Sequence, residues 1–375
     1  MRFPSIESRK GTILPGEFWA GHELCLCIHD AMAQMLVSGQ NAGAFHVKYE
    51  LTEQERQTFE SSEDIFQWVE QNRKPEDHTA LLVTTIFPAI LSDMLHCIYE
   101  VLETSRKAKL NVSYMLLRKP LQESLYVLET VIANREDFAK KLVEEPIKLE
   151  GRGVGGREIH AANIAKVLAS IGSDGRFSPD YLAQLRYDKS TKDGFDGICN
   201  KAIHLFTGHK AIATEKMNIN FIFSGWDAKH TQWSFLYTRL PYLLAYAYQI
   251  VESVCSTIAP GPKEYRDDIE RRIAAHVLMW SGTLADNKTY ASAPLLGFAF
   301  KSREWLFAHC KAHGFRAPEF KDLLRMSQTG AFPGESRWSL WRRLRKFRIA
   351  AEACGSTSAS RLSTAQRALG FDPIL

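Results

Sequence analysis

The segment YMLLRKPLQESLYVLETVI, residues 114–132, constrains the fold of this chain more than any other stretch. Its apolar residues recur at helical spacing and form one stripe: Leu117, Leu121, Leu125, Leu128 and Ile132, widened by Leu116, Val127 and Val131. Such a broad apolar face is typical of a helix packed among other helices. Pro120 has no amide hydrogen to donate to the carbonyl of Leu116, so the helix either begins there or bends.

Helical patterns also dominate the rest of the chain. Thr52 and Asn134 stand where helix N-caps are expected, each followed by acidic residues in the first turn. The predicted helices cover residues 23–37, 78–109 with a bend near Pro88, 113–132, 135–145, 158–171, 179–187, 195–206, 227–258, 264–279, 303–313, 319–326 and 337–354. Only residues 45–51 and 217–225 suggest short extended segments. The predicted fold class is all-α, a helical bundle.

A composition of 45% hydrophobic and 24% charged residues over 375 positions is that of an ordinary soluble protein with room for more than one domain. Pro260-Gly261-Pro262 is the clearest linker. We therefore expect an N-terminal helical region, 1–109, packed on a bundle core, 110–259, and a smaller helical C-terminal domain, 263–375.

Cysteine content, apolar segments and possible metal ligands bear on the location and cofactors of the protein. Seven scattered cysteines fit a reducing compartment, the first residues contain no apolar signal segment, and the apolar run at 80–90 is too short to span a membrane. We expect a cytoplasmic protein without membrane contact. His22 and His29 share a helix face without a carboxylate cluster, and Cys25 and Cys27 have the wrong spacing for a zinc clip, so no metal or cofactor is predicted. The GRGVGG stretch at 151–156 lacks a preceding strand, which favours a linker over a nucleotide loop.

The charge is unevenly distributed. Residues 301–375 carry fourteen Lys and Arg against six Asp and Glu, although the whole chain has a net charge of only +4. Within WSLWRRLRKFR, Trp338, Trp341, Leu344 and Phe347 recur every three residues among five basic residues: Arg342, Arg343, Arg345, Lys346 and Arg348. Basic and aromatic residues together suit nucleic-acid binding. The same pattern suits an amphipathic helix docked on the body with its arginines in water.

One candidate polar centre lies at the borders of the apolar helix face. Arg118, Lys119 and Glu123 flank Pro120, while Asn200 and His204 share a face of a later helix, being four residues apart. A histidine can take a proton near neutral pH and an arginine can hold a phosphate, so the five residues could form a catalytic site. Alternatively, they form a buried polar network that fixes helix register.

The RKPLQES and Asn-x-x-x-His patterns, together with the NREDFAKKL helix, resemble uncharacterised bacterial helical-bundle families of the HEPN (higher eukaryotes and prokaryotes nucleotide-binding) superfamily. The resemblance covers about residues 110–258. It implies a HEPN-like bundle that dimerises, and a metal-independent ribonuclease of toxin or antiphage defence systems. The chain departs from the superfamily signature because no arginine precedes His204 by four to six residues. Lys119 also stands four residues before Glu123, where related families usually place arginine.

The sequence therefore predicts a bacterial RNA-directed protein, with a ribonuclease toxin or defence effector as its specific form. A non-catalytic helical module that binds a partner protein or nucleotide is the alternative, and an enzyme using Glu123 and His204 as acid and base is a third. The Arg-x4–6-His spacing also occurs at Arg73/His78, Arg271/His276 and Arg303/His309, about as often as chance allows. Of these, Arg303/His309 lies on a helix in the basic part.

Overall fold

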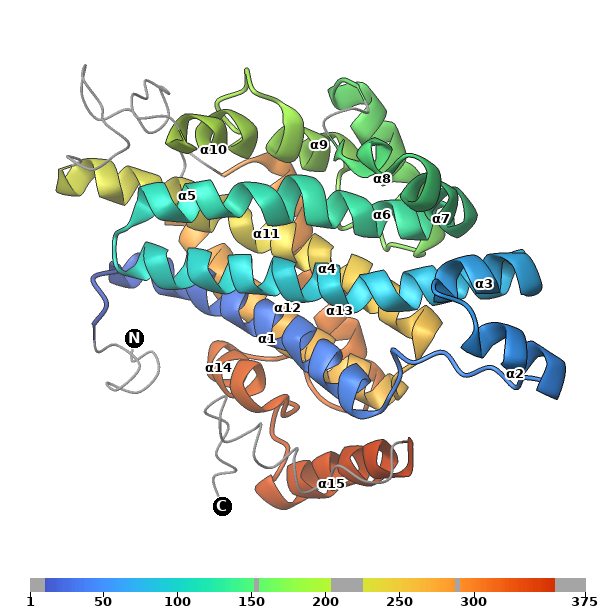
Figure 1. Ribbon diagram of the computed structural model, residues 1–375. Helices are drawn as coiled ribbons and strands as arrows, with labels where there is room; N and C mark the ends of the chain where they lie inside the picture. Colours follow the sequence, from blue (N-terminus) through green and yellow to red (C-terminus); the bar gives the residue numbers. More distant parts are fainter. Residues whose placement is uncertain (1–10, 152–154, 204–224, 287–290, 355–375) are drawn as a thin grey trace.

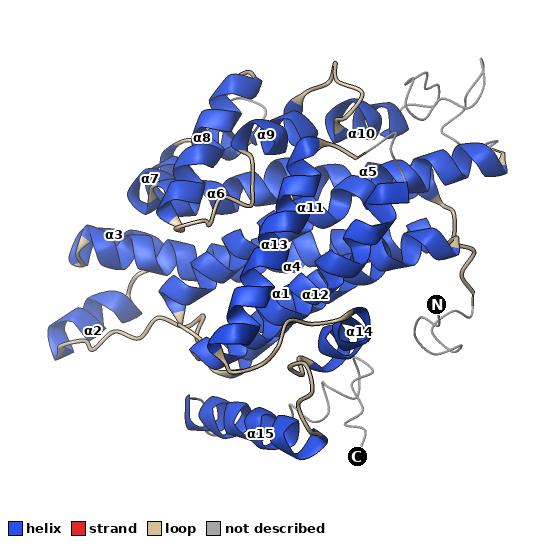
Figure 2. Cartoon of the chain, turned by 180° about the vertical axis from the view of Figure 1, so that it is seen from behind, coloured by secondary structure: helices blue, strands red, loops and turns tan. Residues whose placement is uncertain are grey.

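Helices are the only regular elements in the part of the chain that the structure, a computed structural model, describes: residues 11–151, 155–203, 225–286 and 291–354 (Figure 2). The α-helices are α1 (Trp19–Asn41), α2 (Glu53–Glu60), α3 (Ile65–Asn72), α4 (Pro75–Arg106), α5 (Leu110–Lys119), α6 (Leu125–Ala133), α7 (Arg135–Glu144), α8 (Arg157–Ser170), α9 (Pro179–Tyr187), α10 (Phe195–Ile203), α11 (Trp226–Ile258), α12 (Lys263–Asp286), α13 (Ala293–Ala312), α14 (Phe320–Thr329) and α15 (Arg337–Cys354). The all-α prediction is confirmed.

Local signals placed several helix ends correctly. Thr52 caps α2 in a reciprocal capping box with Glu55, and Asn134 caps α7 through Asp137. The strand expected at 45–51 is wrong: those residues form an irregular connection between α1 and α2. Of the second expected extended segment, residues 217–224 lie outside the described ranges.

Helix α11 is the centre of the bundle. Its residues from Gln232 to Tyr248 are buried without a break, so it is surrounded by other helices rather than packed on one side. Three aromatic side chains form hydrogen bonds between α11 and the neighbouring helices α4, α5 and α12. Trp233 Nε1 donates to the carbonyl of Ser105 on α4 at 2.8 Å, Tyr114 Oη of α5 donates to the carbonyl of Gln232 at 2.7 Å, and Trp280 Nε1 of α12 donates to that of Tyr237 at 2.8 Å.

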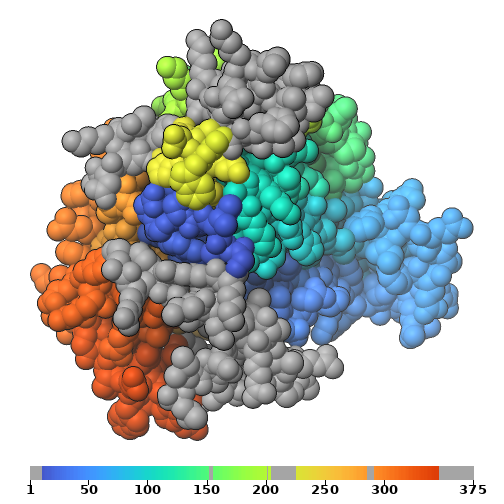
Figure 3. Space-filling model, turned by 90° about the vertical axis from the view of Figure 1, so that its left-hand side faces the viewer, coloured from blue at the N-terminus to red at the C-terminus, as the bar shows by residue number. Residues whose placement is uncertain are grey.

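Helix α1 crosses α11 at close range. A Cβ added to Gly21 would lie 3.0 Å from both the Cβ and the carbonyl oxygen of Tyr237, so a larger residue would push the two helices apart. The view in Figure 3 shows the first turns of α1, α5 and α11 gathered side by side at one end of the bundle. Elements far apart in the sequence therefore share one core.

Helix α4 runs unbroken for 32 residues with Pro88 inside it, where the sequence predicted a bend. It is the one described helix long and apolar enough to cross a membrane by length and composition. It packs against α1, α5 and α7, and a core helix passes the same test. Its length therefore carries no conclusion about membranes.

Helices α5 and α6 form one continuous helix that contains a wider, π-helical turn at Pro120–Ser124. Residues Pro120–Ser124 adopt π-helical geometry between α5 and α6, and the amide of Leu125 donates to the carbonyl of Pro120, five residues back. The sequence predicted a start or a bend at Pro120, and the chain accommodates the proline by inserting this turn. Such turns are frequent at functional sites, so the side chains around this turn are candidates for a functional site.

Helices α12 and α13 belong to two cores. Ile273, Trp280, Leu295 and Phe298 join the main core around α11. A smaller second cluster forms where α12, α13 and α14 meet: Ala274, Ala275, Met279, Leu306, Cys310, Leu323, Met326 and Phe332. Helix α15 lies beyond that cluster at the edge of the molecule (Figures 1 and 2). The domain boundary at 260–262 stays a prediction. Residues of α12, which follows that boundary, nevertheless pack into the main core.

Candidate functional site

Of the residues predicted to form a catalytic centre, Arg118 and Lys119 lie on α5, Glu123 in the π-turn and Asn200 on α10. Arg118 Nε donates to Gln122 Oε1 at 3.2 Å, and Lys119 Nζ forms an exposed ion pair with Asp93 of α4 at 2.7 Å. The hydrogen bond that Lys119 donates to Asp93 raises the pKa of Lys119. Glu123 is half-buried in the π-turn. Lys119 is thus directed toward α4.

Helix α10 packs against α5 and carries Asn200, which is half-buried. Burial raises the pKa of the Cys199 thiol on the same helix. His204 lies outside the described residues. Helices α5 and α10, which carry Arg118, Lys119 and Asn200, are therefore neighbours, while convergence of all five side chains stays a prediction.

A buried ionic network lies on the other side of the π-turn, and sequence reasoning missed it. Arg186 of α9 is fully buried and binds the carboxylate of Glu129 on α6 through both terminal nitrogens. Its Nε donates to the carbonyl of Leu121 in the π-turn at 2.7 Å. Tyr246 Oη of α11 donates to Glu129 at 2.7 Å, and Gln122 Nε2 donates to the carbonyl of Arg186 at 2.7 Å.

The charged groups of this network bind each other, and Gln122 links the network to Arg118 on α5. Burial alone would lower the pKa of Arg186, but the negative charge of Glu129 outweighs burial and raises it. A buried and fully satisfied pair of this kind fixes how helices meet and offers no group to a ligand. The signal in the sequence was Glu129, an acidic residue among the apolar residues of 125–132, which implies a buried cationic partner.

A second arginine network joins α12 to the segment before α15. Asp268 accepts from Arg271 Nη2 at 2.5 Å, from Arg272 Nε at 2.9 Å and from Arg343 Nη1 at 2.6 Å. Burial would raise the pKa of Asp268, but the arginines, Arg272 first, lower it overall. Arg343 also binds Glu335, with Nη2 3.0 Å from Oε2. Arg343 therefore anchors α15 to the body, and its predicted contact with nucleic acid stays a prediction.

Gly330 makes this junction possible. It ends α14 in the left-handed conformation, with φ of 67°, and its carbonyl accepts from Arg271 Nε at 2.9 Å and from Arg343 Nη2 at 2.8 Å. A Cβ at this position would lie 2.3 Å from a carboxylate oxygen of Asp268. Only glycine allows the chain to pass so close to the carboxylate.

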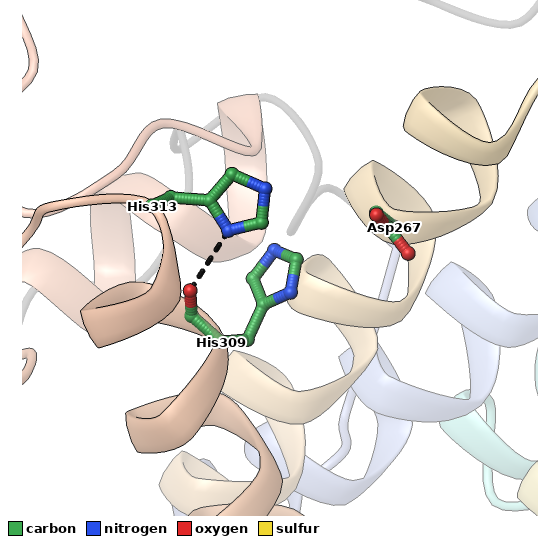
Figure 4. A group of neighbouring side chains, drawn as sticks. All are labelled: Asp267, His309 and His313. Atoms are coloured by element: carbon green, nitrogen blue, oxygen red, sulfur yellow. Dashed lines mark hydrogen bonds between the residues drawn. The ribbon is translucent and has the colours of Figure 1, made fainter.

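The edge of this second network carries two histidines. Arg271 Nη1 donates to His309 Nε2 at 3.0 Å, which joins an arginine and a histidine from two different sequence-spacing pairs. Burial first, and then the charge of Arg271, lower the pKa of His309 to about 4. His313 lies one turn later on α13, and the two imidazoles face Asp267 of α12 (Figure 4). Arg303, the predicted partner of His309, instead lies over the Phe307 ring at 5.1 Å.

The outward face of α15 presents aromatic and basic side chains to solvent. Trp338 is 64% exposed and Trp341 52% exposed. The Arg342 guanidinium lies 4.2 Å from the Trp338 ring centre, and that of Arg345 lies 5.3 Å from the Trp341 ring centre. The side chains of Lys346 and Arg348 lie outside those described.

These four side chains stand on one face because residues three, four and seven apart share a helix face. The half-buried residues Leu340 and Arg343 lie on the opposite face, toward the body. Trp338, Trp341 and Leu344 are all exposed, so they are not the residues through which α15 packs on the body. The outward face of α15 is called the Trp-Arg surface and consists of Trp338, Trp341, Arg342 and Arg345.

Comparisons with known proteins give no relative from which a role could be transferred. No family model, no curated protein and no solved structure matches this chain.

Proposed function

We propose that the chain binds single-stranded RNA through the Trp-Arg surface. The observation that carries this proposal is the exposure of Trp338 and Trp341, each with an arginine guanidinium against its ring. Exposed aromatic rings that lie next to each other, unlike a single exposed ring, often mark an interaction site. Bases stack on aromatic rings with about 1–3 kcal/mol per base, and nearby arginines neutralise the backbone phosphates.

The spacing of the surface fits a flexible strand. Trp338 and Trp341 are three residues apart, a rise of about 4.5 Å along the helix axis. Two neighbouring unpaired bases can reach two such rings, whereas bases stacked inside a duplex cannot. An anionic membrane is a weaker fit, because an interfacial helix keeps its charges away from its apolar face. Here Arg342 and Arg345 lie directly against the tryptophans.

The test is fluorescence anisotropy of a labelled oligouridylate titrated with the full chain. Trp338→Ala combined with Trp341→Ala should weaken affinity roughly five- to hundredfold. Arg342→Gln with Arg345→Gln should weaken affinity and also flatten its salt dependence between about 50 and 200 mM. Trp226→Ala is the matched control, since Trp226 is 57% exposed on α11, away from the surface.

Two results would overturn the proposal. One is wild-type RNA binding that the surface substitutions leave unchanged. The other is binding of vesicles with anionic lipid, abolished by the tryptophan substitutions, without any RNA binding, which would assign the surface to a lipid bilayer instead.

The specific form of the proposal is a metal-independent ribonuclease acting in toxin or antiphage defence. It is supported by the resemblance of residues 110–258 to HEPN-like families and by the packing of α10, which carries Asn200, against α5, which carries Arg118. His204 would act as the base, with Arg118 or Lys119 stabilising the phosphorane. Wild type should then cleave structured RNAs without added metal. His204→Ala should lose cleavage at an unchanged melting temperature. Absence of cleavage by wild type would leave the non-catalytic interaction module.

A further inference from the structure

His309, His313 and Asp267 bring three potential metal ligands together at the end of α13. Each offers one ligand atom, and these atoms lie within 4.8 Å of one another. A tetrahedral ion with bonds of about 2.0–2.1 Å holds its ligand atoms roughly 3.4 Å apart. Because His313 is exposed and Asp267 only half-buried, small side-chain rotations can close that difference.

The hydrogen bonds already orient one of the imidazoles for a metal. His313 Nδ1 lies 2.9 Å from the carbonyl oxygen of His309, and a carbonyl can only accept, so Nδ1 carries the proton. The lone pair is then on Nε2, the nitrogen remote from that carbonyl (Figure 4). A backbone carbonyl that fixes the tautomer of a histidine ligand is the usual supporting contact in metal sites.

Asp267 supplies the anionic ligand. The backbone carbonyl of Asp267 accepts a long hydrogen bond from Arg271 Nη1, at 3.4 Å. Among the described residues, its carboxylate forms no ion pair or hydrogen bond. The neighbouring Asp268 is in the opposite situation, because three arginines occupy its oxygens. Of two adjacent carboxylates on α12, one thus balances the arginines and the other faces the histidines.

Arg271 opposes the site and sets its strength. Its Nη1 occupies His309 Nε2, so a cation can use that nitrogen only after Nη1 has moved away. Because the guanidinium is one rigid plane, Nη1 can move only with Nε and Nη2, which must then release the carbonyl of Gly330 and Asp268. The positive charge nearby weakens the site for any cation, which predicts binding weaker than at an unobstructed set of the same ligands.

We propose that Asp267, His309 and His313 bind a divalent transition metal of the zinc class, with water as the fourth ligand. Two imidazoles with one carboxylate suit Zn²⁺ or Ni²⁺, whereas Mg²⁺ and Ca²⁺ prefer ligand sets made of oxygen. An open fourth position distinguishes the site from a closed structural zinc site. The proposal is independent of RNA binding, since no residue of the Trp-Arg surface takes part.

The test is calorimetric titration of the metal-stripped full chain with Zn²⁺. Wild type should bind one ion that is lost, or weakened at least about tenfold, in His313→Ala and in Asp267→Asn. The matched control is His230→Ala. His230 pairs with Glu17 at 2.7 Å and so offers a histidine and a carboxylate without a second histidine. The control should bind like wild type, and circular dichroism should show all variants folded.

Thermal unfolding with and without Zn²⁺ tests the same site if other histidines and cysteines also bind ions in the calorimeter. Zn²⁺ should raise the melting temperature of wild type and His230→Ala, and the rise should be smaller in His313→Ala and Asp267→Asn. Equal stoichiometry, affinity and thermal shift in all four proteins would overturn the proposal. So would a wild type that binds no Zn²⁺.

Discussion

The arginine–carboxylate networks around Glu129 and around Asp268 differ in which neighbouring polar groups remain accessible to a ligand. Around Glu129, the fully buried side chains of Arg186 and Tyr246 both bind its carboxylate. Around Asp268 and Arg343, the same chemistry lies at the edge of the second core and joins a helix to the body. The first network leaves nothing for a ligand. The second leaves two histidines, one carboxylate and an exposed helix face, which is where we place the candidate functions.

Breaking the network around Glu129 should have the largest effect on stability. Arg186→Met leaves Glu129 buried without a cation, which should cost about 3–5 kcal/mol in the free energy of unfolding. Urea denaturation measures it. Arg157→Gln, in an exposed pair with Asp188, is the control and should cost about 0.5 kcal/mol or less.

The double variant Arg186→Met, Glu129→Leu sharpens this prediction. It removes both charges and should recover part of the lost stability, since the cost comes mainly from the unpaired carboxylate. If Arg186→Met lost less than about 1 kcal/mol, Glu129 would not be confined as the structure places it.

Breaking the second network should act locally. Arg343→Gln removes the ion pairs to Asp268 and Glu335, and we expect a loss of about 1–3 kcal/mol that falls mainly on the docking of α15. Hydrogen exchange should accelerate in α15 and stay unchanged in α11. Arg345→Gln, two residues later on the outward face, should change neither. Faster exchange throughout the bundle would contradict an anchoring role.

Acid should separate the two regions in the same way. The pKa of Glu335 is lowered: burial raises it, but the hydrogen bond from Arg343 and other contacts outweigh burial. A lowered folded pKa contributes stability that is complete above the unfolded value, about 4.3, and is lost as pH falls through the folded value. Hydrogen exchange below pH 4 should therefore release α15 before α11. Simultaneous release of both helices would contradict this.

The sequence predicted those parts of the fold whose causes are local. Thr52 and Asn134 cap helices through residues three positions away, and Pro120 disturbs the turn in which it stands. Residues 45–51 fail for the opposite reason: an alternating pattern forms a strand only beside a partner strand, and the described residues contain none.

The candidate sites depended on partners far along the chain. Arg186 meets Glu129 across 57 residues, and Arg343 meets Asp268 across 75. A three-residue period of Trp338, Trp341 and Leu344 indicates an amphipathic helix, yet the ion pair of Arg343 decides which face docks. His309 and His313 were visible as residues four apart, but only the packing of α12 on α13 supplies Asp267.

The smallest effect on stability is expected at the Trp-Arg surface. Trp338→Ala and Trp341→Ala should each change the free energy of unfolding by no more than about 0.5 kcal/mol, because both rings are exposed. The measurement is again urea denaturation. A loss above about 2 kcal/mol would show that the rings support packing, and the surface would no longer be available as a binding platform.

Photo-crosslinking tests RNA binding at the Trp-Arg surface most directly, because it requires no substitution. The wild-type chain would be irradiated with an oligouridylate carrying 4-thiouridine, and the cross-linked peptides sequenced. Cross-links should concentrate in the peptides of α15 that carry Trp338 and Trp341, and should fade as salt rises. Cross-links confined to α5 and α10, or no complex at all, would contradict binding at this surface.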